Sequence, residues 1–182
     1  MRKLLIGSLV AFSLHVQAQT VDPATNLLTY SEVVEVNGVG KNELYVRANT
    51  WFTRAFKNSK AVLQLEDKEA GKLIGKGNIS TTIKVPIVGM TDAGYVDMTV
   101  TVQCKDGKYK YTIDNLNHQK PLGPNTQYWV SAGPLEQEKP KVGLMGRPSK
   151  KEWSDLKEDA DITIKAMIAD LKKAMAKADA DF

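Results

Sequence analysis

Residues suited to nucleophilic chemistry are scarce in this sequence. It contains one cysteine, Cys104, and two histidines, of which only His118 lies beyond an apolar N-terminal segment. A Ser–His–Asp or Cys–His arrangement would have to use His118. Cys104 is in phase with the apolar positions of an alternating strand, which predicts a buried, inert thiol. We interpret His118 as a solvated loop residue, and the sequence therefore predicts no catalytic residue.

Metal-binding residues are equally few. One histidine and one cysteine cannot complete a tetrahedral zinc site without several carboxylates. The acidic turn that contains Glu66, Asp67 and Glu69 offers oxygen ligands for a hard cation, but lysines interrupt it and the spacing of an EF-hand is absent. We interpret this turn as a charged hairpin tip, and we predict no metal site and no cofactor.

Two neighbouring aromatic residues are the candidates for a contact site. Tyr128 and Trp129 lie in the segment 116–148, which is rich in proline and glycine and which we predict to be a long loop. Exposed aromatic side chains on loops commonly mark contact sites, so both are candidate binding residues, together with the polar face of the predicted sheet. In the alternative interpretation the two side chains fold back over a sheet edge. A short strand over 127–131 is also compatible with the pattern.

Hydrophobic periodicity predicts the elements that position these residues. Between 95 and 104 apolar and polar residues alternate strictly, and an Asp-Gly turn at Asp106 and Gly107 leads into a second alternating strand. Such alternation is typical of an antiparallel sheet with one buried and one solvated face. In chain order we expect a strand over 30–37, a helix over about 44–57, strands over 61–67 and 72–86, a loop over 87–94, strands over 95–104 and 108–114, and a helix over about 150–178.

The two predicted helices are amphipathic. The first has an apolar side that includes Trp51 and Phe52, while Arg47 and Arg54 fall on its polar side. The last begins with a capping box at 149–152 and carries an apolar seam with a spacing of three to four residues. Two such helices and one half-polar sheet bury each other most simply when both helices cover the same face. The predicted fold is α+β: an antiparallel curved sheet in the order β-α-β-β-β-β-α, with both helices on one face.

Two glycines interrupt the apolar face of the strand 72–86. Gly75 and Gly77 share that face with Leu73 and Ile79. We interpret them as leaving room for the first helix, with its tryptophan and phenylalanine as neighbours. Bending of the sheet at these glycines is the alternative.

The N-terminal residues predict the compartment. Arg2 and Lys3 precede the apolar run 4–14, and small residues follow it, a pattern typical of an export signal. As a helix this run covers only about 17 Å of the roughly 30 Å of a bilayer core. We therefore expect a signal peptide over 1–18, a polar lead over 19–29 and a single domain over 30–182. Because no cysteine stands directly after the run, we expect a periplasmic or secreted protein without a lipid anchor.

Three segments of the sequence resemble a known family. The segments are Val34-Glu35-Val36-Asn37-Gly38, Asn42-Glu43-Leu44-Tyr45 with Trp51, and residues 65–77. They are similar to secreted Bacteroidota proteins of the domain of unknown function 4468 family, which is described as having a TATA-binding-protein-like fold. The resemblance covers roughly residues 33–115. It implies that fold and supplies no catalytic residues.

Charge and surface pattern argue against a nucleic-acid partner despite that fold name. The formal net charge is +4, and the predicted leader accounts for two of the basic residues. A minor-groove saddle also places apolar wedges on its exposed face, whereas the predicted solvated face carries threonine, asparagine, aspartate and lysine.

The sequence therefore predicts an exported, non-enzymatic binding or envelope-associated module. Its partner would be an unknown protein or envelope component, and we expect no transmembrane segment. The oligomeric state stays open. The alternative is an envelope hydrolase that uses carboxylates in the segment 116–148 or at hairpin tips.

Overall fold

The computed structural model describes residues 20–56, 63–123, 126–141 and 148–176. The predicted leader 1–18 and the predicted end of the last helix beyond 176 lie outside the described residues. The elements in chain order are β1 (Thr20–Val21), β2 (Leu28–Glu35), α1 (Lys41–Ala55), β3 (Leu63–Asp67), β4 (Lys72–Val85), β5 (Gly89–Lys105), β6 (Lys108–Pro121), β7 (Trp129–Pro134) and α3 (Lys150–Ala176).

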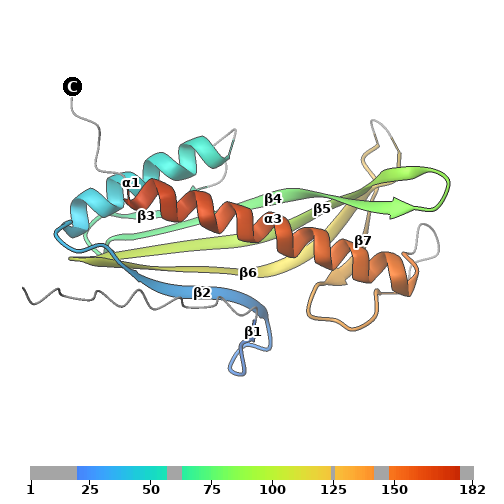
Figure 1. The fold of residues 1–182 in the computed structure, drawn as a ribbon, viewed down its shortest axis with the longest axis horizontal. Helices are drawn as coiled ribbons and strands as arrows, with labels where there is room; N and C mark the ends of the chain where they lie inside the picture. Colours follow the sequence, from blue (N-terminus) through green and yellow to red (C-terminus); the bar gives the residue numbers. More distant parts are fainter. Residues whose placement is uncertain (1–19, 57–62, 124–125, 142–147, 177–182) are drawn as a thin grey trace, which may run out of the picture.

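The strands form one antiparallel sheet (Figure 1). It is seven-stranded, in the order β1-β2-β6-β5-β4-β3, and β7 pairs with β6 outside this path. The first part of β6 pairs with β2, from Lys108 to Ile113, and its last part pairs with β7. The predicted hairpin turn is confirmed, since β5 and β6 meet at the pair Lys105 and Lys108.

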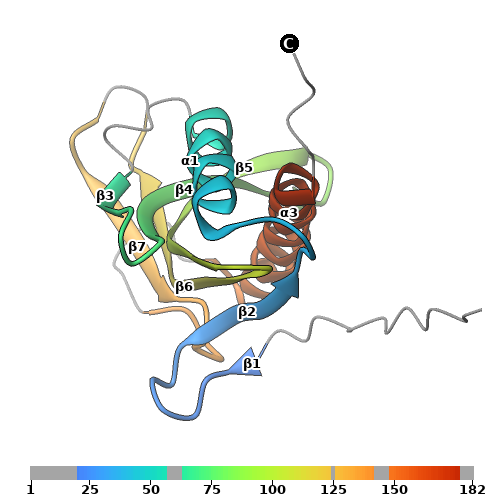
Figure 2. The same ribbon diagram turned by 90° about the vertical axis from the view of Figure 1, so that its left-hand side faces the viewer.

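Both helices cover the same face of the sheet, as the sequence predicts. Figures 1 and 2 show α1 and α3 side by side on one side of the strands. Trp51 of α1 and Trp153 of α3 are each 1% exposed, and Val100 and Val102 of β5 are fully buried. The strand residues beneath the helices form the core with them: Leu73, Val96, Met98, Val100, Val102, Cys104, Tyr109, Tyr111, Ile113 and Leu116. None of the described helices is long and apolar enough to cross a membrane.

The two helices also contact each other through polar groups. The indole Nε1 of Trp51 donates to Asp170 at 2.9 Å, and the exposed Arg54 forms an ion pair with the same carboxylate. Arg47 is only 6% exposed, so its placement on the solvated side of the helix was wrong. Its Nη1 donates to the backbone oxygen of Met175 at 2.6 Å, because the last carbonyls of α3 lack partners within the helix and attract a cation.

Each helix start has its own cap. At α3 the predicted capping box is confirmed: the Ser149 amide donates to Glu152 Oε2 at 2.6 Å, and the Glu152 amide donates to Ser149 Oγ at 3.2 Å. At α1 the N-cap residue is Gly40, which has no side chain to contribute. Asp106 of the β5–β6 turn serves instead, accepting from the amide of Lys41 at 2.7 Å.

Gly77 makes room for the first helix, as the sequence predicts, although its neighbour is a different residue. A Cβ at Gly77 would lie 2.3 Å from a ring atom of Phe56, at the end of α1. Phe56 in turn packs on Trp51 and Phe52 at ring-centroid distances of 6.0 Å. A larger residue at position 77 would displace that aromatic group.

Two expectations about loops were wrong. The predicted loop 87–94 belongs to a long hairpin, in which Val85 pairs with Gly89 and β5 begins at once. The predicted loop 116–148 begins too early, because β6 continues to Pro121. The short strand expected over 127–131 is present as β7, shifted to 129–134, and the polar lead contains the short strand β1, which pairs with β2. Glycine and proline were taken as breaks in the chain, but here they lie in turns, at bulges and at the end of an edge strand.

Candidate binding site on the polar face of the sheet

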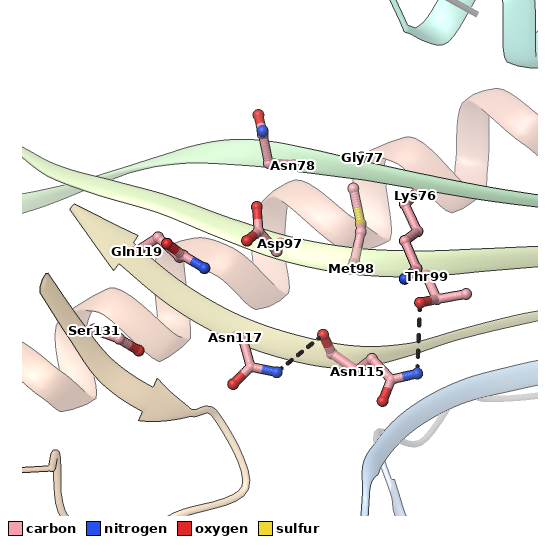
Figure 3. Close-up of a pocket in the computed structure, with 10 residues that line it drawn as sticks. All are labelled: Lys76, Gly77, Asn78, Asp97, Met98, Thr99, Asn115, Asn117, Gln119 and Ser131. Carbon is pink, nitrogen blue, oxygen red and sulfur yellow. Dashed lines mark hydrogen bonds between the residues drawn. The ribbon is translucent and has the colours of Figure 1, made fainter. Parts of the chain in front are cut away.

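The face of the sheet opposite the helices contains an open hollow. Figure 3 shows this face, with the side chains of β4, β5 and β6 in view and α3 behind the strands. The hollow has a volume of about 640 Å³, and we call it the polar hollow. The residues that line it are Lys76, Gly77, Asn78, Asp97, Met98, Thr99, Asn115, Asn117, Gln119 and Ser131.

Strand register arranges the polar residues in rows across three strands. Asn78 of β4 pairs with Asp97 of β5, which pairs with Asn117 of β6. In the neighbouring row, Tyr95 of β5 pairs directly with Gln119 of β6. Because paired residues of neighbouring strands project to the same face of a sheet, the rows form a continuous polar surface.

Two β-bulges frame these rows. Between Asp97 and Thr99 the pairing of β5 with β6 shifts register, because β6 has one extra residue there. Asn115 lies in this bulge and has a positive φ of 55°. Between Thr81 and Thr82 the pairing of β4 with β5 shifts as well, next to Gly94 at φ 98°. Bulges bend a strand and increase its local twist, which hollows a sheet that would otherwise be flatter.

The bulge at Asn115 also decides which residues of β6 face the hollow. Before it, Tyr109, Tyr111 and Ile113 point toward the helices and are buried. After it the phase is reversed, so that Leu116 is buried while Asn117 and Gln119 lie on the open face. A single extra residue thus brings the amide side chains into the site.

A second hollow extends the site toward β7. It has a volume of about 480 Å³ and is lined by Asn78, Tyr95, Asp97, Gln119 and Trp129. The rings of Tyr95 and Trp129 lie 6.1 Å apart between centroids, with an angle of 48° between their planes. Trp129 is 51% exposed, so one end of the combined site carries an accessible aromatic surface. Because three residues line both hollows, the two are continuous.

The structure treats the two predicted contact residues differently. Trp129 lines the second hollow. Tyr128 is 67% exposed, and its backbone oxygen accepts from the amide of Leu122 at 2.9 Å. It is not among the residues that line either hollow, and its role in binding stays a prediction that only a binding assay can test.

Among the described residues that line the polar hollow, Asp97 is the one carboxylate. Partial burial raises the pKa of Asp97 above its ordinary value, while a hydrogen bond with the Gln119 side chain acts in the opposite direction. Lys76 supplies the single cationic group within this described part of the lining. The lining therefore has no net charge when both groups are ionised.

Hydrogen bonds within the lining hold some of its amides in place. Asn115 Nδ2 donates to Asp114 Oδ1 at 2.9 Å and lies 3.5 Å from Thr99 Oγ1. Asn117 Nδ2 donates to the backbone oxygen of Asn115 at 3.5 Å (Figure 3). Because Asn117 uses its Nδ2 in this hydrogen bond, its amide oxygen is the atom that can accept a hydrogen bond from a ligand. The arrangement combines oriented donors and acceptors on one open surface.

His118 lies directly behind this surface, and its interpretation as a solvated loop residue was wrong. It is 4% exposed, because the bulge at Asn115 turns it toward the helices. Its Nε2 lies 2.8 Å from the oxygen of Ala93, and the Ala132 amide donates to Nδ1 at 3.0 Å. This geometry requires the neutral ring with the proton on Nε2, and burial lowers the pKa accordingly. The imidazole thus ties β7 to the β4–β5 hairpin.

The remaining residues considered for chemistry have structural roles. Cys104 is buried, as predicted, and burial raises its pKa to about 11. In the acidic turn, Glu66 accepts from Asn49, and Asp67 accepts from the amide of Ala70. Among the described residues no group of three or more histidine, cysteine, aspartate or glutamate side chains is placed to hold a metal ion.

The amides of β6 were missed by sequence reasoning, although a signal is present. Residues 115–119 read Asn-Leu-Asn-His-Gln, in which Leu116 and His118 alternate with three side-chain amides. The phase of this alternation is opposite to that of Tyr109 and Tyr111, whereas the segment from 116 onward was assigned to a loop on its prolines and glycines. A reversal of phase is the sequence signature of a bulge.

The sheet with two helices on one face defines an α+β protein with a TATA-binding-protein-like fold. Residues 30–119 match the model of a domain of unknown function (DUF4468) with TBP-like fold. The chain belongs to this family.

Two solved structures have the same fold. A DUF4468 family protein from Bacteroides ovatus ATCC 8483 superposes with a TM-score of 0.65 at 14% identity, over 89% of this chain and 94% of the other. A TBP-like protein from Parabacteroides distasonis ATCC 8503 gives a TM-score of 0.63 at 15% identity, over 87% and 99% of the two chains. No curated protein matches the chain. Likeness at this identity shows the fold alone.

Proposed function

We propose that this protein is an exported, non-enzymatic binding module whose ligand occupies the polar hollow and its aromatic extension. The observation that carries the proposal is the hollowed face between two bulges, which is lined by hydrogen-bonding side chains and ends at Trp129. Pockets with a few convergent polar groups are the usual form of a ligand site. The family and the fold do not specify an activity, so the proposal rests on the site.

The carboxylates at the hairpin tips favour binding over hydrolysis. Asp67, Asp92 and Asp106 each accept a hydrogen bond from a backbone amide of a turn, a bulge or a helix start. Glycoside hydrolysis uses a pair of carboxylates that face each other across the substrate. From the part of the chain that the structure describes, the polar hollow receives Asp97 as its one carboxylate, which suits recognition of a hydroxyl or amide group.

Sedimentation with washed cell envelopes of Bacteroides ovatus tests the proposal. We expect the wild-type protein to sediment with the envelopes and the Trp129→Ala and Asn117→Ala/Gln119→Ala variants to remain in solution. Gln103→Ala is the matched control, because Gln103 is an exposed amide on the same face of β5 but outside the hollow. Equal sedimentation of all variants, or none by the wild type, would contradict the proposal.

An assay with generic ester, glycoside and peptide substrates tests the non-enzymatic part. We expect no turnover. Turnover that is abolished by changing one aspartate or glutamate would favour the hydrolase.

Fractionation of expressing cells tests export. The sequence motivates this part of the proposal through the leader 1–18. We expect a processed form that begins at Gln19 in the periplasm or the medium. An unprocessed chain retained in the cytoplasm would contradict export.

A further inference from the structure

The hydrogen-bonding groups of the hollow indicate the chemistry of its ligand. Asn78, Asn117 and Gln119 each carry two N–H donors and an acceptor oxygen, and Thr99 adds a hydroxyl. A hydroxyl group of a ligand is likewise a donor and an acceptor. The lining therefore complements a ligand that is rich in hydroxyl groups, since each amide can both give and receive a hydrogen bond.

Charge in the hollow argues against an ionic ligand. Lys76 and Asp97 are the charged residues of the lining, and their charges offset each other. Sites for phosphate or sulfate contain several arginines or lysines or the start of a helix, and the residues described around the hollow include neither. The charge of the site thus complements an uncharged molecule.

The aromatic end supplies an apolar surface of a specific kind. Trp129 is half exposed and stands at the far end of the hollow from Lys76, with Tyr95 tilted against it. A sugar ring carries C–H groups on one face, and these pack on an indole while the hydroxyls at its rim remain free for hydrogen bonds. The same ligand can therefore satisfy the indole and the amides.

Strand pairing disfavours an extended peptide. A peptide that adds a strand requires an unpaired sheet edge. The hollow lies on the face of β5, which is paired with β4 and with β6 along the rows, and β6 is paired with β7 beside Gln119. The backbone of a peptide has no such edge within the hollow.

We propose that the hollow binds an uncharged oligosaccharide, with one sugar ring packed on Trp129 and the hydroxyls of the next rings on Asn78, Asn117 and Gln119. This inference rests on the proposed function and specifies its ligand. It assigns separate parts to the two ends of the site: the indole provides contact area, and the amides select for hydroxyl groups.

An array of immobilised uncharged and acidic oligosaccharides, with unstructured peptides as a third class, tests the inference. We expect the wild-type protein to bind members of the uncharged class. Calorimetry with the best soluble uncharged oligosaccharide then gives affinities. Trp129→Ala and Gln119→Ala should each weaken binding by roughly tenfold or more, as truncation of a central contact does, while Gln103→Ala leaves it unchanged.

The outcomes separate the two proposals. Binding of an acidic oligosaccharide or a peptide that depends on Trp129 and Gln119 would overturn the ligand class and leave the binding module standing. Binding of an uncharged oligosaccharide that is indifferent to both substitutions would overturn the site. If no probe of any class binds, the ligand class is wrong, and the envelope sedimentation decides separately whether the module binds at all. Circular dichroism of each variant confirms that a loss of binding is not a loss of fold.

Discussion

The two faces of the sheet are built from the same strands and serve different purposes. On the helix-covered face of β5, Val100 and Val102 are fully buried, and beside them the indole N–H of Trp51 donates to Asp170. On the open face of the same strand, Asp97 and Thr99 line a hollow. Alternation along one strand thus separates residues that hold the fold from residues that are free to contact a ligand. Substitutions on the two faces should therefore have separable effects.

The largest effect on stability is expected beneath the helices. Trp153 is 1% exposed, and its Nε1 donates to the backbone oxygen of Gln137 at 3.1 Å. Trp153→Ala should lower the free energy of unfolding by about 3–5 kcal/mol, because it creates a cavity and removes one of the two hydrogen bonds to that carbonyl, the other coming from Lys157. Urea denaturation measures the change. A loss below about 1 kcal/mol would show that α3 is not packed as described.

A smaller effect is expected where the two helices meet. Arg47→Met removes the donor to the Met175 carbonyl and should cost about 2 kcal/mol, the range for a hydrogen bond from a charged group. Arg54→Met is the matched control. Its ion pair with Asp170 is exposed, so its loss should cost less than about 1 kcal/mol. Equal effects of the two substitutions in urea denaturation would contradict the burial of Arg47.

The stability of the protein should depend on pH through the buried His118 of β6. Burial lowers its pKa in the folded state below the ordinary value of 6.5. As the pH falls, His118 therefore takes up a proton in the unfolded chain before it does so in the folded protein. The contribution of His118 to stability is complete above pH 6.5 and declines below it. Urea denaturation across this range should show the decline in the wild type and a smaller one in His118→Gln. An identical decline in both would mean that other groups cause it.

The smallest effect on stability is expected on the open face. Trp129→Ala should change the free energy of unfolding by no more than about 0.5 kcal/mol, since half of the side chain is already in solvent. The same substitution should abolish retention on cell envelopes. If it instead destabilised the protein by as much as Trp153→Ala, Trp129 would be a core residue, and the distinction between the faces would fail.

Local patterns in the sequence predicted much of the helix-covered face. The alternation over 95–104 placed Cys104 in the core, and the capping box at Ser149 placed the start of α3. Both features depend on neighbours within a few residues, which a sequence displays directly. The common face of the two helices also followed, because it is the simplest way to bury two apolar stripes against one sheet.

The open face could not be predicted to the same extent, because its shape depends on bulges and on distant partners. Asn115 reverses the phase of β6, and without that reversal Gln119 would lie under the helices and His118 in solvent. Arg47 looked like a surface residue because its partner, the end of α3, lies more than a hundred positions away in the chain. Polarity alone does not reveal such pairs.

Ligand binding on the open face between the bulges can be located by ¹⁵N NMR titration of the protein with the uncharged oligosaccharide that binds best on the array. The amide signals that shift should belong to the middle of β4, β5 and β6, together with the indole and amide of Trp129, while signals of α1 and of the β5–β6 turn at Asp106 stay in place. Shifts centred on the helices, or no shifts with any uncharged oligosaccharide, would contradict the account.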